Sequence, residues 1–443
     1  MPSTNAATVF EVSARARRRT MRRLLPFLFI CYLIANLDRV NVAFATLDMS
    51  RDLHLSDRVF GLGAGIFFLG YLLLEVPGTL IVERWSARRW FSLILVFWGV
   101  VAALTGFIES KRMFYIMRFL LGLGESGFFP GVIVYLTHWF SDEDRAKAAA
   151  MFIAASPLAN VLGAPIAGLL LRVHWFGIEG WRWLFIVEAV PAVLFGVVTL
   201  AYLTDWPHQA QWLSVEERQW ITTAREQEEQ AKHAVRSYTI SQALRQRDVI
   251  SLTLSYFLFN SVVYGFLLWL PTILKRASGF SNLTVALLAA LPYVVGLAGM
   301  LLNGWHSDKT RERRWHAALP LYVCGTALLI AAAAGPRFWL TLAMFILVGG
   351  SISCYAPPFW ALPGVALSET SAAACIGVIN SIGSLGGFAG PYMLGYLRTK
   401  SQSFATGLIY LVAMAFLAAT VVLSVRSGQP LKAVQRNAGD SAL

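Results

Sequence analysis

Hydrophobic residues in this chain gather in twelve long, uninterrupted runs separated by polar segments. Each run is close to the roughly 20 residues that a helix needs to cross a hydrocarbon core of about 30 Å. The runs are 24–47, 59–82, 90–108, 113–136, 146–171, 183–203, 249–274, 284–304, 316–334, 338–360, 372–397 and 403–425. They lack the alternation of barrel strands, and only helices or closed barrels satisfy their backbone polar groups in lipid. The pattern therefore predicts twelve transmembrane helices.

One long polar stretch, 205–248, divides the runs into two groups of six. Within it, Ser214 followed by Glu217 fits a capping box, so a short surface helix is expected to begin there. We expect a basic cytoplasmic N-terminus at 1–23, six-helix bundles at 24–204 and 249–425, a cytoplasmic linker at 205–248 and a cytoplasmic tail at 426–443.

The two halves share a short motif in which a glycine precedes an acidic–basic pair and two arginines. It comprises Gly78 with Glu83 and Arg84 in the first half, and Gly304 with Asp308 and Lys309 in the second. Gly78 and Gly304 are 226 residues apart, and the same offset separates Pro165 from Pro391. Two unrelated pairs with one offset indicate a tandem duplication in one orientation, which is typical of transporters that move two bundles about a central site.

Composition and charge agree with a membrane protein. The 443 residues are 57% hydrophobic and 14% charged, whereas soluble proteins carry about 25% charged residues. The net charge of +12 could suit nucleic acid, but Lys and Arg are roughly twice as frequent in the segments assigned to the cytoplasm as outside, which is the positive-inside rule. We expect a multi-pass protein of the bacterial inner membrane, with lipid and no nucleic acid as partner. The first run is too long for a cleaved signal peptide.

The sequence offers no motif for catalysis or for a cofactor. Cys31, Cys324, Cys354 and Cys375 lie within the runs and lack metal-ligand spacing, so we interpret them as small core residues. Phosphate-loop, haem, zinc and nucleophile-elbow patterns are also missing from the sequence. We therefore expect no metal, no cofactor and no enzymatic activity.

Four charged residues lie inside the runs, where a charge costs several kcal/mol and usually faces a partner or water. They are Asp38 and Arg39 in the first run and Arg118 and Glu125 in the fourth. At 1.5 Å per residue from the ends of their runs, all four fall in one layer somewhat outside the midplane. Arg118 and Glu125 also share a helix face with Gly122. The two glycines between Arg118 and Glu125 are expected to leave room beside that face.

An arginine beside an acid in such a layer can act as a switch. Arginine binds a carboxylate with two hydrogen bonds and keeps its charge, while a carboxylate in a poorly hydrated cavity can take up a proton near neutral pH. Protonation of the acid would free the arginine for the carboxylate of a substrate, so that proton and anion move together. A permanent ion-pair network between the first and fourth spans is the alternative.

Five motifs in order carry a resemblance to a known family. They are Leu37–Asn41, Tyr71–Pro77, Arg118–Pro130, Trp181–Glu188 and Trp206–Leu213. With the doubled loops, they make nearly the whole chain resemble the major facilitator superfamily and, within it, the anion:cation symporters, which carry sugar acids, tartrate, phthalate and hydroxyphenylacetate. The resemblance implies an all-α membrane protein of twelve transmembrane helices in two pseudo-symmetric six-helix bundles. Glu83 departs from the aspartate usual in that loop but keeps its charge.

The resemblance also implies roles for individual residues. Asp38 and Glu125 would be the proton-coupling groups, and Arg39 and Arg118 would recognise the anion. Polar and aromatic side chains are expected to border the substrate: Tyr71, Tyr256, Asn260, Tyr264, Trp360 and Asn380, several of which match bordering positions in the family. Helix packing is the alternative for each of these residues.

Other charged residues are expected to serve as gates or supports. Glu75 would brace the loop after the second run, and the pairs Glu83–Arg84 and Asp308–Lys309 would form cytoplasmic latches, with simple positive-inside anchoring as the alternative. Glu188 is expected to pair with Arg182 or with nearby backbone.

The sequence therefore predicts a monomeric, proton-coupled symporter that imports a small organic carboxylate by alternating access. The substrate could be a sugar acid, a hydroxy acid or an aromatic acid. An exporter or anion exchanger of the same substrates is the main alternative. A channel or receptor would leave the doubled loops unexplained.

Overall fold

The computed structural model describes residues 3–233, 246–366 and 369–426, and within these ranges the chain is helical and contains no strand. The first half consists of α1 (Ser3–Asp52), α2 (Asp57–Arg84), α3 (Ala87–Thr105), α4 (Lys111–Glu125), α5 (Phe128–Trp139), α6 (Asp142–Ile153), α7 (Ala155–Leu170) and α8 (Gly180–Tyr202). The second half consists of α11 (Arg247–Ser278), α12 (Asn282–Thr310), α13 (Arg314–Ala333), α14 (Phe338–Ala366), α15 (Glu369–Ser384), α16 (Gly386–Ser401) and α17 (Phe404–Leu423). Part of the predicted linker (234–245), the predicted tail from 427 onward and the side chain of Cys375 lie outside the described residues.

Eleven segments of the described chain are long and apolar enough to cross a membrane. They correspond to the predicted runs except 372–397, which folds as two helices of 16 residues, α15 and α16, joined at Leu385. The predicted runs 113–136 and 146–171 are divided in the same way, into α4 and α5 and into α6 and α7. Gly386 and Gly390 bring the backbone of α16 directly against the backbone of Phe257 and Ser261 in α11, and this close approach accompanies the break. Helices α15 and α16 together supply the twelfth crossing.

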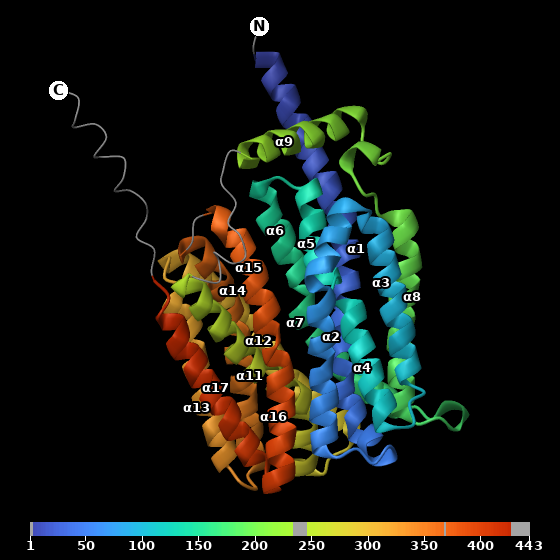
Figure 1. The fold of residues 1–443 in the computed structure, drawn as a ribbon, viewed down its shortest axis with the longest axis vertical. Coiled ribbons are helices and arrows are strands. Elements are labelled where there is room, and N and C mark those ends of the chain that lie inside the picture. The colour runs from blue at the N-terminus through green and yellow to red at the C-terminus, as the bar shows by residue number, and fades with distance from the viewer. Residues whose placement is uncertain (1–2, 234–245, 367–368, 427–443) are drawn as a thin grey trace, which may run out of the picture.

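The helices form two bundles that lie side by side (Figure 1). Between the bundles, α2 packs against α16 and α7 packs against α12. The 226-residue offset carries α2 onto α12 and α7 onto α16, so these two contacts are one contact made twice about a pseudo-two-fold axis. Glycine permits the close approach at both, with Gly61 against Pro391 and Gly168 against Ala286.

The linker helix α9 (Val215–His233) lies across the projecting end of α1 (Figure 1). The predicted capping box is confirmed: Glu217 N donates to Ser214 Oγ at 3.2 Å, and Ser214 N donates to Glu217 Oε2 at 2.9 Å. The same carboxylate accepts from Arg19 Nη1 at 2.8 Å. The arginine cluster before the first span therefore fastens the linker to the end that the charge distribution assigns to the cytoplasm.

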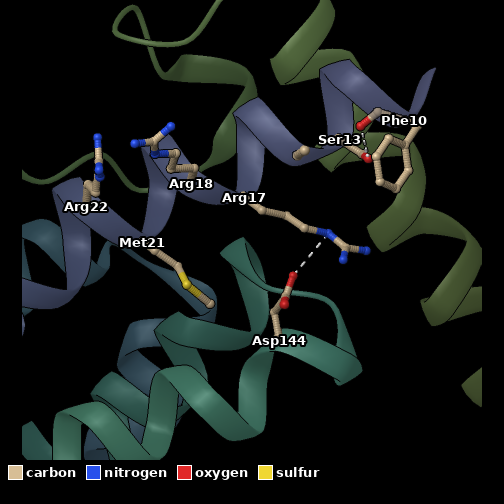
Figure 2. A pocket seen from close by; sticks show the side chains of 8 residues that line it. Phe10, Ser13, Arg17, Arg18, Met21, Arg22 and Asp144 are labelled. Carbon is tan, nitrogen blue, oxygen red and sulfur yellow. Dashed lines mark hydrogen bonds and ion pairs between the residues drawn. The ribbon is translucent and has the colours of Figure 1, made fainter. Parts of the chain in front are cut away.

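A cavity of about 470 Å³ opens beside the projecting part of α1 (Figure 2). It is lined by Phe10, Ser13, Ala14, Arg17, Arg18, Met21, Arg22 and Asp144. Arg17 Nε lies 3.1 Å from Asp144 Oδ2, which ties the extension to the start of α6. Because its lining includes no predicted site residue, this cavity belongs to the cytoplasmic end and not to the intramembrane charged layer.

Candidate functional site

Helices α1 and α4 bring Arg39 and Glu125 together in the interior of the first bundle. Arg39 Nη2 and Nε donate to Glu125 Oε2 at 2.9 and 3.1 Å. Glu125 is buried and the Arg39 side chain is largely so. Two of the four predicted intramembrane charges therefore form a charge-assisted pair, the stronger kind of hydrogen bond in proteins.

One aromatic ring contacts both arginines. The guanidinium carbons of Arg39 and Arg118 are 5.4 and 4.9 Å from the Phe67 ring centroid, and Arg39 is 5.3 Å from the Tyr71 ring. Such cation–π contacts strengthen when they are removed from water. The sequence analysis missed Phe67, although it precedes Tyr71 by one helical turn on the same face of α2.

The two glycines of α4 do not leave open space, and that expectation was wrong. A side chain at Gly122 would collide with the backbone of Phe67, and one at Gly124 would meet the ring of Phe97 and the Cβ of Trp98. The glycines instead let α2 and α3 approach α4 closely, which brings Phe67 within reach of Arg118.

Arg118 is the charged residue of the layer with the fewest hydrogen-bond partners among the described residues. It is 1% exposed, and none of its three guanidinium nitrogens has a hydrogen-bond partner within the described residues. An unsatisfied buried charged group costs more than the roughly 1–3 kcal/mol of a neutral one. A buried guanidinium with its donors unused is a natural binding group for an anion.

Asp38 lies in the same layer but does not pair with Arg39. Its Oδ2 accepts from Trp98 Nε1 of α3 at 3.2 Å, and its Oδ1 has no hydrogen-bond partner within the described part of the chain. The negative charges that act on it come from Glu188 and then Glu125. The charged layer therefore extends to α8, which the sequence analysis did not include in the site.

Glu188 does not pair with Arg182, so the first of its two predicted partners was wrong. Arg182 Nη1 donates to the carbonyls of Gly106 and Ile108 at 2.8 and 3.2 Å and stacks on Trp181. Arg182 is in the first turn of α8, whereas Glu188 is more than a turn deeper and interacts with Asn41 of α1.

Of the predicted residues in the second half, Tyr264 lies nearest the charged layer. Its ring centroid is 4.3 Å from that of Phe68 in α2, and it interacts electrostatically with Arg39. Tyr256 packs on Trp360 with ring centroids 5.0 Å apart. Asn260 Nδ2 donates to the carbonyl of Gly383 at 3.1 Å. Tyr71 therefore contacts Arg39 and Tyr264 interacts with it electrostatically, while Tyr256, Asn260 and Trp360 make contacts within the second bundle.

Glu75 joins the two bundles, contrary to the expectation that it braces the following loop. The carboxylate accepts a short hydrogen bond from Asn380 Nδ2 of α15. Glu75 is eight residues from Glu83, about 12 Å along the helix, and is buried among the helices. A predicted gating residue and a predicted substrate residue thus contact each other.

The predicted cytoplasmic latch residues are exposed, and their partners among the described residues lie within their own bundle. Asp308 accepts from Arg313 Nη1 at 2.6 Å, and Lys309 Nζ lies 5.2 Å from the Trp305 ring centroid. Within the described residues, no ion pair joins Glu83 or Arg84 to Asp308 or Lys309. Their latch role stays a prediction.

Ionic contacts do cross between the bundles at the opposite, outer end. Arg276 of α11 donates to both carboxylate oxygens of Asp57 in α2, at 2.6 and 2.8 Å. Arg398 of α16 approaches the same carboxylate at 3.8 Å. Asn282 Nδ2 of α12 donates to Asp48 of α1 at 2.6 Å. This outer contact was not predicted, because within its own segment each of these residues is an ordinary charged or polar residue at a helix end.

Comparison with known proteins agrees with this architecture. Residues 28–391 match the family model described as Major Facilitator Superfamily. A protein assigned as a tartrate transporter in Agrobacterium vitis is 43% identical over 421 residues, covering 95% of this chain and 96% of its own length. A quinolone resistance transporter of Acinetobacter baumannii is 37% identical, covering 88% and 90%. The inward-open structure of the xylose transporter XylE from E. coli has a TM-score of 0.75 at 16% identity, covering 93% and 98%, and shows a shared fold alone.

Proposed function

Because the chain belongs to the Major Facilitator Superfamily, we propose that it is a proton-coupled symporter that imports a small organic carboxylate. It is a multi-pass transporter of the cell membrane and not an enzyme. The proposal concerns the substrate, the coupling ion and the direction of transport.

The buried guanidinium of Arg118 carries the proposal. Its three nitrogens have no hydrogen-bond partner in the described chain, and Arg39 of the Arg39–Glu125 pair contacts the same Phe67 ring. A carboxylate bound at Arg118 would satisfy donors that the described chain leaves unused. Two guanidinium groups around one ring suit a substrate with one or two carboxylates.

Proton coupling follows from competition for Arg39. While Glu125 is ionised, it holds Arg39 through two hydrogen bonds. A proton on Glu125 removes its charge and weakens that pair, so Arg39 can turn to the substrate carboxylate. Proton and anion then bind together, and loss of the proton on the inside restores the pair and expels the anion.

The class of acid is proposed from a relative and from the side chains near Arg39. The similar protein assigned as a tartrate transporter suggests a hydroxy dicarboxylate. The hydroxyl groups of Tyr71 and Tyr264, both of which interact with Arg39, can hydrogen-bond hydroxyls of such a substrate. Sugar acids share this chemistry and form the wider substrate class.

The two bundles, 24–204 and 249–425, would move as units about this site, with 205–248 as the linker. The Asp57–Arg276 contact closes the outer end while Glu83, Arg84, Asp308 and Lys309 are exposed at the cytoplasmic end. We infer that this arrangement is the inward-facing state of the carrier. The Glu75–Asn380 contact would then have to break or slide as the bundles move.

Export is the second candidate function. The relative named for quinolone resistance is 37% identical over 390 residues, and the same charged layer could couple proton entry to exit of an organic compound. The two functions differ in the direction of net movement relative to the proton gradient.

The test is uptake into proteoliposomes of fixed orientation with an inward proton gradient. A panel of radiolabelled acids, including tartrate and hexonates, is compared for the wild type, Glu125→Gln and the control Glu109→Gln, an exposed outer-loop glutamate. We expect gradient-driven accumulation of one acid, loss of that accumulation in Glu125→Gln with retention of exchange, and normal behaviour of the control.

Two outcomes would overturn the proposal. If no acid accumulates and the gradient instead drives loss of preloaded compound, the protein is an exporter. If an acid accumulates equally in the wild type and in Glu125→Gln, Glu125 is not the coupling residue and proton symport through it fails.

A further inference from the structure

A second group of buried polar atoms lies behind the Arg39–Glu125 pair, inside the first bundle. It consists of Asp38 and Asn41 of α1 and Glu188 of α8, which are 0%, 2% and 7% exposed. Four of their atoms have no hydrogen-bond partner within the described residues: Asp38 Oδ1, Asn41 Oδ1 and Nδ2, and Glu188 Oε2. Buried polar groups almost always have hydrogen-bond partners, so four unpartnered polar atoms in one cluster need an explanation.

The geometry of α1 divides this group from the substrate side. Successive residues turn by about 100° around a helix, so Arg39 and Asn41 point to different sides of α1 with Asp38 between them. Arg39 reaches Glu125 of α4, and Asn41 interacts with Glu188 of α8. Asp38 therefore lies between the side of α1 that faces Glu125 and the side that faces Glu188.

The walls of this group are apolar and tightly packed. Trp98 of α3, itself fully buried, donates its indole N–H to Asp38. Helices α3 and α8 approach closely through Gly99 against Ala192 and Gly196 against Leu95. Packing of this kind leaves little room for water to screen the carboxyl groups.

The charges in the cluster are of one sign. Asp38 is faced by Glu188 from α8 and by Glu125 from α4, while Trp98 from α3 is an uncharged donor. Glu125 is neutralised by Arg39, but Glu188 interacts with the uncharged amide of Asn41. Two carboxylates that share a water-poor site cannot both be ionised without a large cost.

We propose that Asp38, Asn41 and Glu188 form a closed proton-holding site, in which the two carboxyl groups share one proton through direct contact and the Asn41 N–H donates to whichever of them is ionised. When Asp38 loses the proton, its O–H bond breaks, the electron pair stays on Asp38, and an O–H bond forms at Glu188 Oε2. No other reactant is required. The oxygens are too few to replace the hydration shell of a metal cation, and the Trp98 and Asn41 N–H donors also disfavour one.

The role of this site in transport rests on the proposed proton coupling. The existence of the site does not depend on that coupling. Glu188 would hold the proton on the side of α1 away from the substrate, so that Asp38 can change its charge without releasing the proton into the pathway. Glu188 would then determine how readily Asp38 takes up a proton from that pathway.

Infrared spectroscopy of the purified, substrate-free protein tests the site directly. Protonated carboxyl groups absorb separately from carboxylates, so the spectrum of Glu188→Gln is subtracted from that of the wild type at neutral pH. We expect one protonated-carboxyl band that shifts in Asp38→Asn and is retained in the conservative variant Glu188→Asp. Glu179→Gln, which removes an exposed glutamate just before the same helix, is the matched control and should leave the band unchanged.

Three results would overturn the proposal. Absence of the band means that Glu188 is ionised. A band that does not shift in Asp38→Asn means that the proton is not shared. Loss of the band on adding Na⁺, but not K⁺, assigns the site to a metal cation. Each result holds whether or not an acid is transported, so it can be told apart from failure of the proposed function.

Transport gives a second readout once a substrate is known. Loss of the shared proton leaves two like charges in the wild type but only one in Glu188→Gln, so the pH of half-maximal uptake should fall by about one unit in the variant. Exchange at saturating proton concentration should persist. An unchanged pH profile would remove Glu188 from the coupling mechanism.

Discussion

At the scale of single residues, the two arginines of the charged layer differ in whether their hydrogen-bond donors have partners. Arg39 is held by Glu125 at 2.9 Å, whereas Arg118 rests on the Phe67 ring with no hydrogen-bond partner in the described chain. The strongest unused hydrogen-bonding capacity in the layer therefore belongs to Arg118. A structural ion-pair network would not be expected to leave one of its two arginines unpaired.

Substitution of Arg118 tests this difference. Because charge-assisted hydrogen bonds contribute about 1.5–3 kcal/mol, Arg118→Gln should raise the apparent KM for the transported acid by about ten- to a hundredfold. Arg118→Lys keeps the charge but not the planar fork, so it should recover only part of that loss. The measurement is concentration-dependent uptake or exchange in proteoliposomes, with the exposed Arg112→Gln on the same helix as control. Equal KM values for Arg118→Gln and wild type would contradict an anion-binding role.

At the scale of helices, caps and breaks decide how the segments end. Glu312 accepts from the backbone N–H of Trp315 at 2.9 Å and of His316 at 3.2 Å, and so caps the start of α13. Its carboxylate also lies 3.0 Å from His316 Nδ1. Burial alone would raise the pKa of Glu312, but these hydrogen bonds and the His316 ring outweigh it and hold the pKa below its ordinary value of 4.5. The cap therefore helps to stabilise the second doubled loop.

The sign of this shift gives a pH prediction. A carboxyl whose pKa is lowered by folding stabilises the folded state above its unfolded-state pKa, and this contribution is lost as the pH falls through the folded-state pKa. Wild type should therefore unfold at a higher temperature than Glu312→Gln near neutral pH, and the difference should shrink below pH 4.5. Thermal unfolding in detergent across a pH series measures it, with the exposed Glu226→Gln as control. A difference that does not vary with pH would exclude the ionised cap.

At the scale of the whole molecule, the two bundles are held together asymmetrically. The contacts of α2 with α16 and of α7 with α12 repeat by pseudo-symmetry, but among the described residues the ion pairs of Asp57 with Arg276 and Arg398 are made at the outer end. The charged residues of the cytoplasmic loops are exposed instead. The ionic contact centred on Asp57 therefore favours closure of the outer end in a structure whose helix contacts repeat by pseudo-symmetry.

Breaking that contact should shift the balance towards the outward-facing state. The side chains of Arg276 and Asp57 are 42% and 17% exposed, so the pair is worth about 1 kcal/mol and Asp57→Asn should change the ratio of the two states several-fold. Distances between spin labels on the outer ends of the bundles would measure the change. Arg276→Gln, which removes the other partner, should shift the ratio in the same direction, and Arg51→Gln, whose contacts stay within α1, should leave it unaltered. If Asp57→Asn has no effect on the distances, this pair is not a gate.

The sequence by itself determined the membrane architecture. Twelve apolar runs, the 226-residue repeat and the capping box at Ser214 are properties of short segments or of fixed offsets, and lipid leaves a long apolar run no alternative to a helix. The depth of Asp38, Arg39, Arg118 and Glu125 followed in the same way, because helical rise converts residue number into depth.

Only the tertiary structure decided which charges meet. Glu188 faces Asn41 and not Arg182, Glu75 bonds Asn380 from 305 residues away, and Asp57 meets Arg276 across 219 residues. Several charged groups share each depth, and their pairing depends on how far every helix is rotated and on which neighbours it packs against. Close contacts such as Phe67 against Gly122 fix those rotations, and no local pattern in the sequence specifies them.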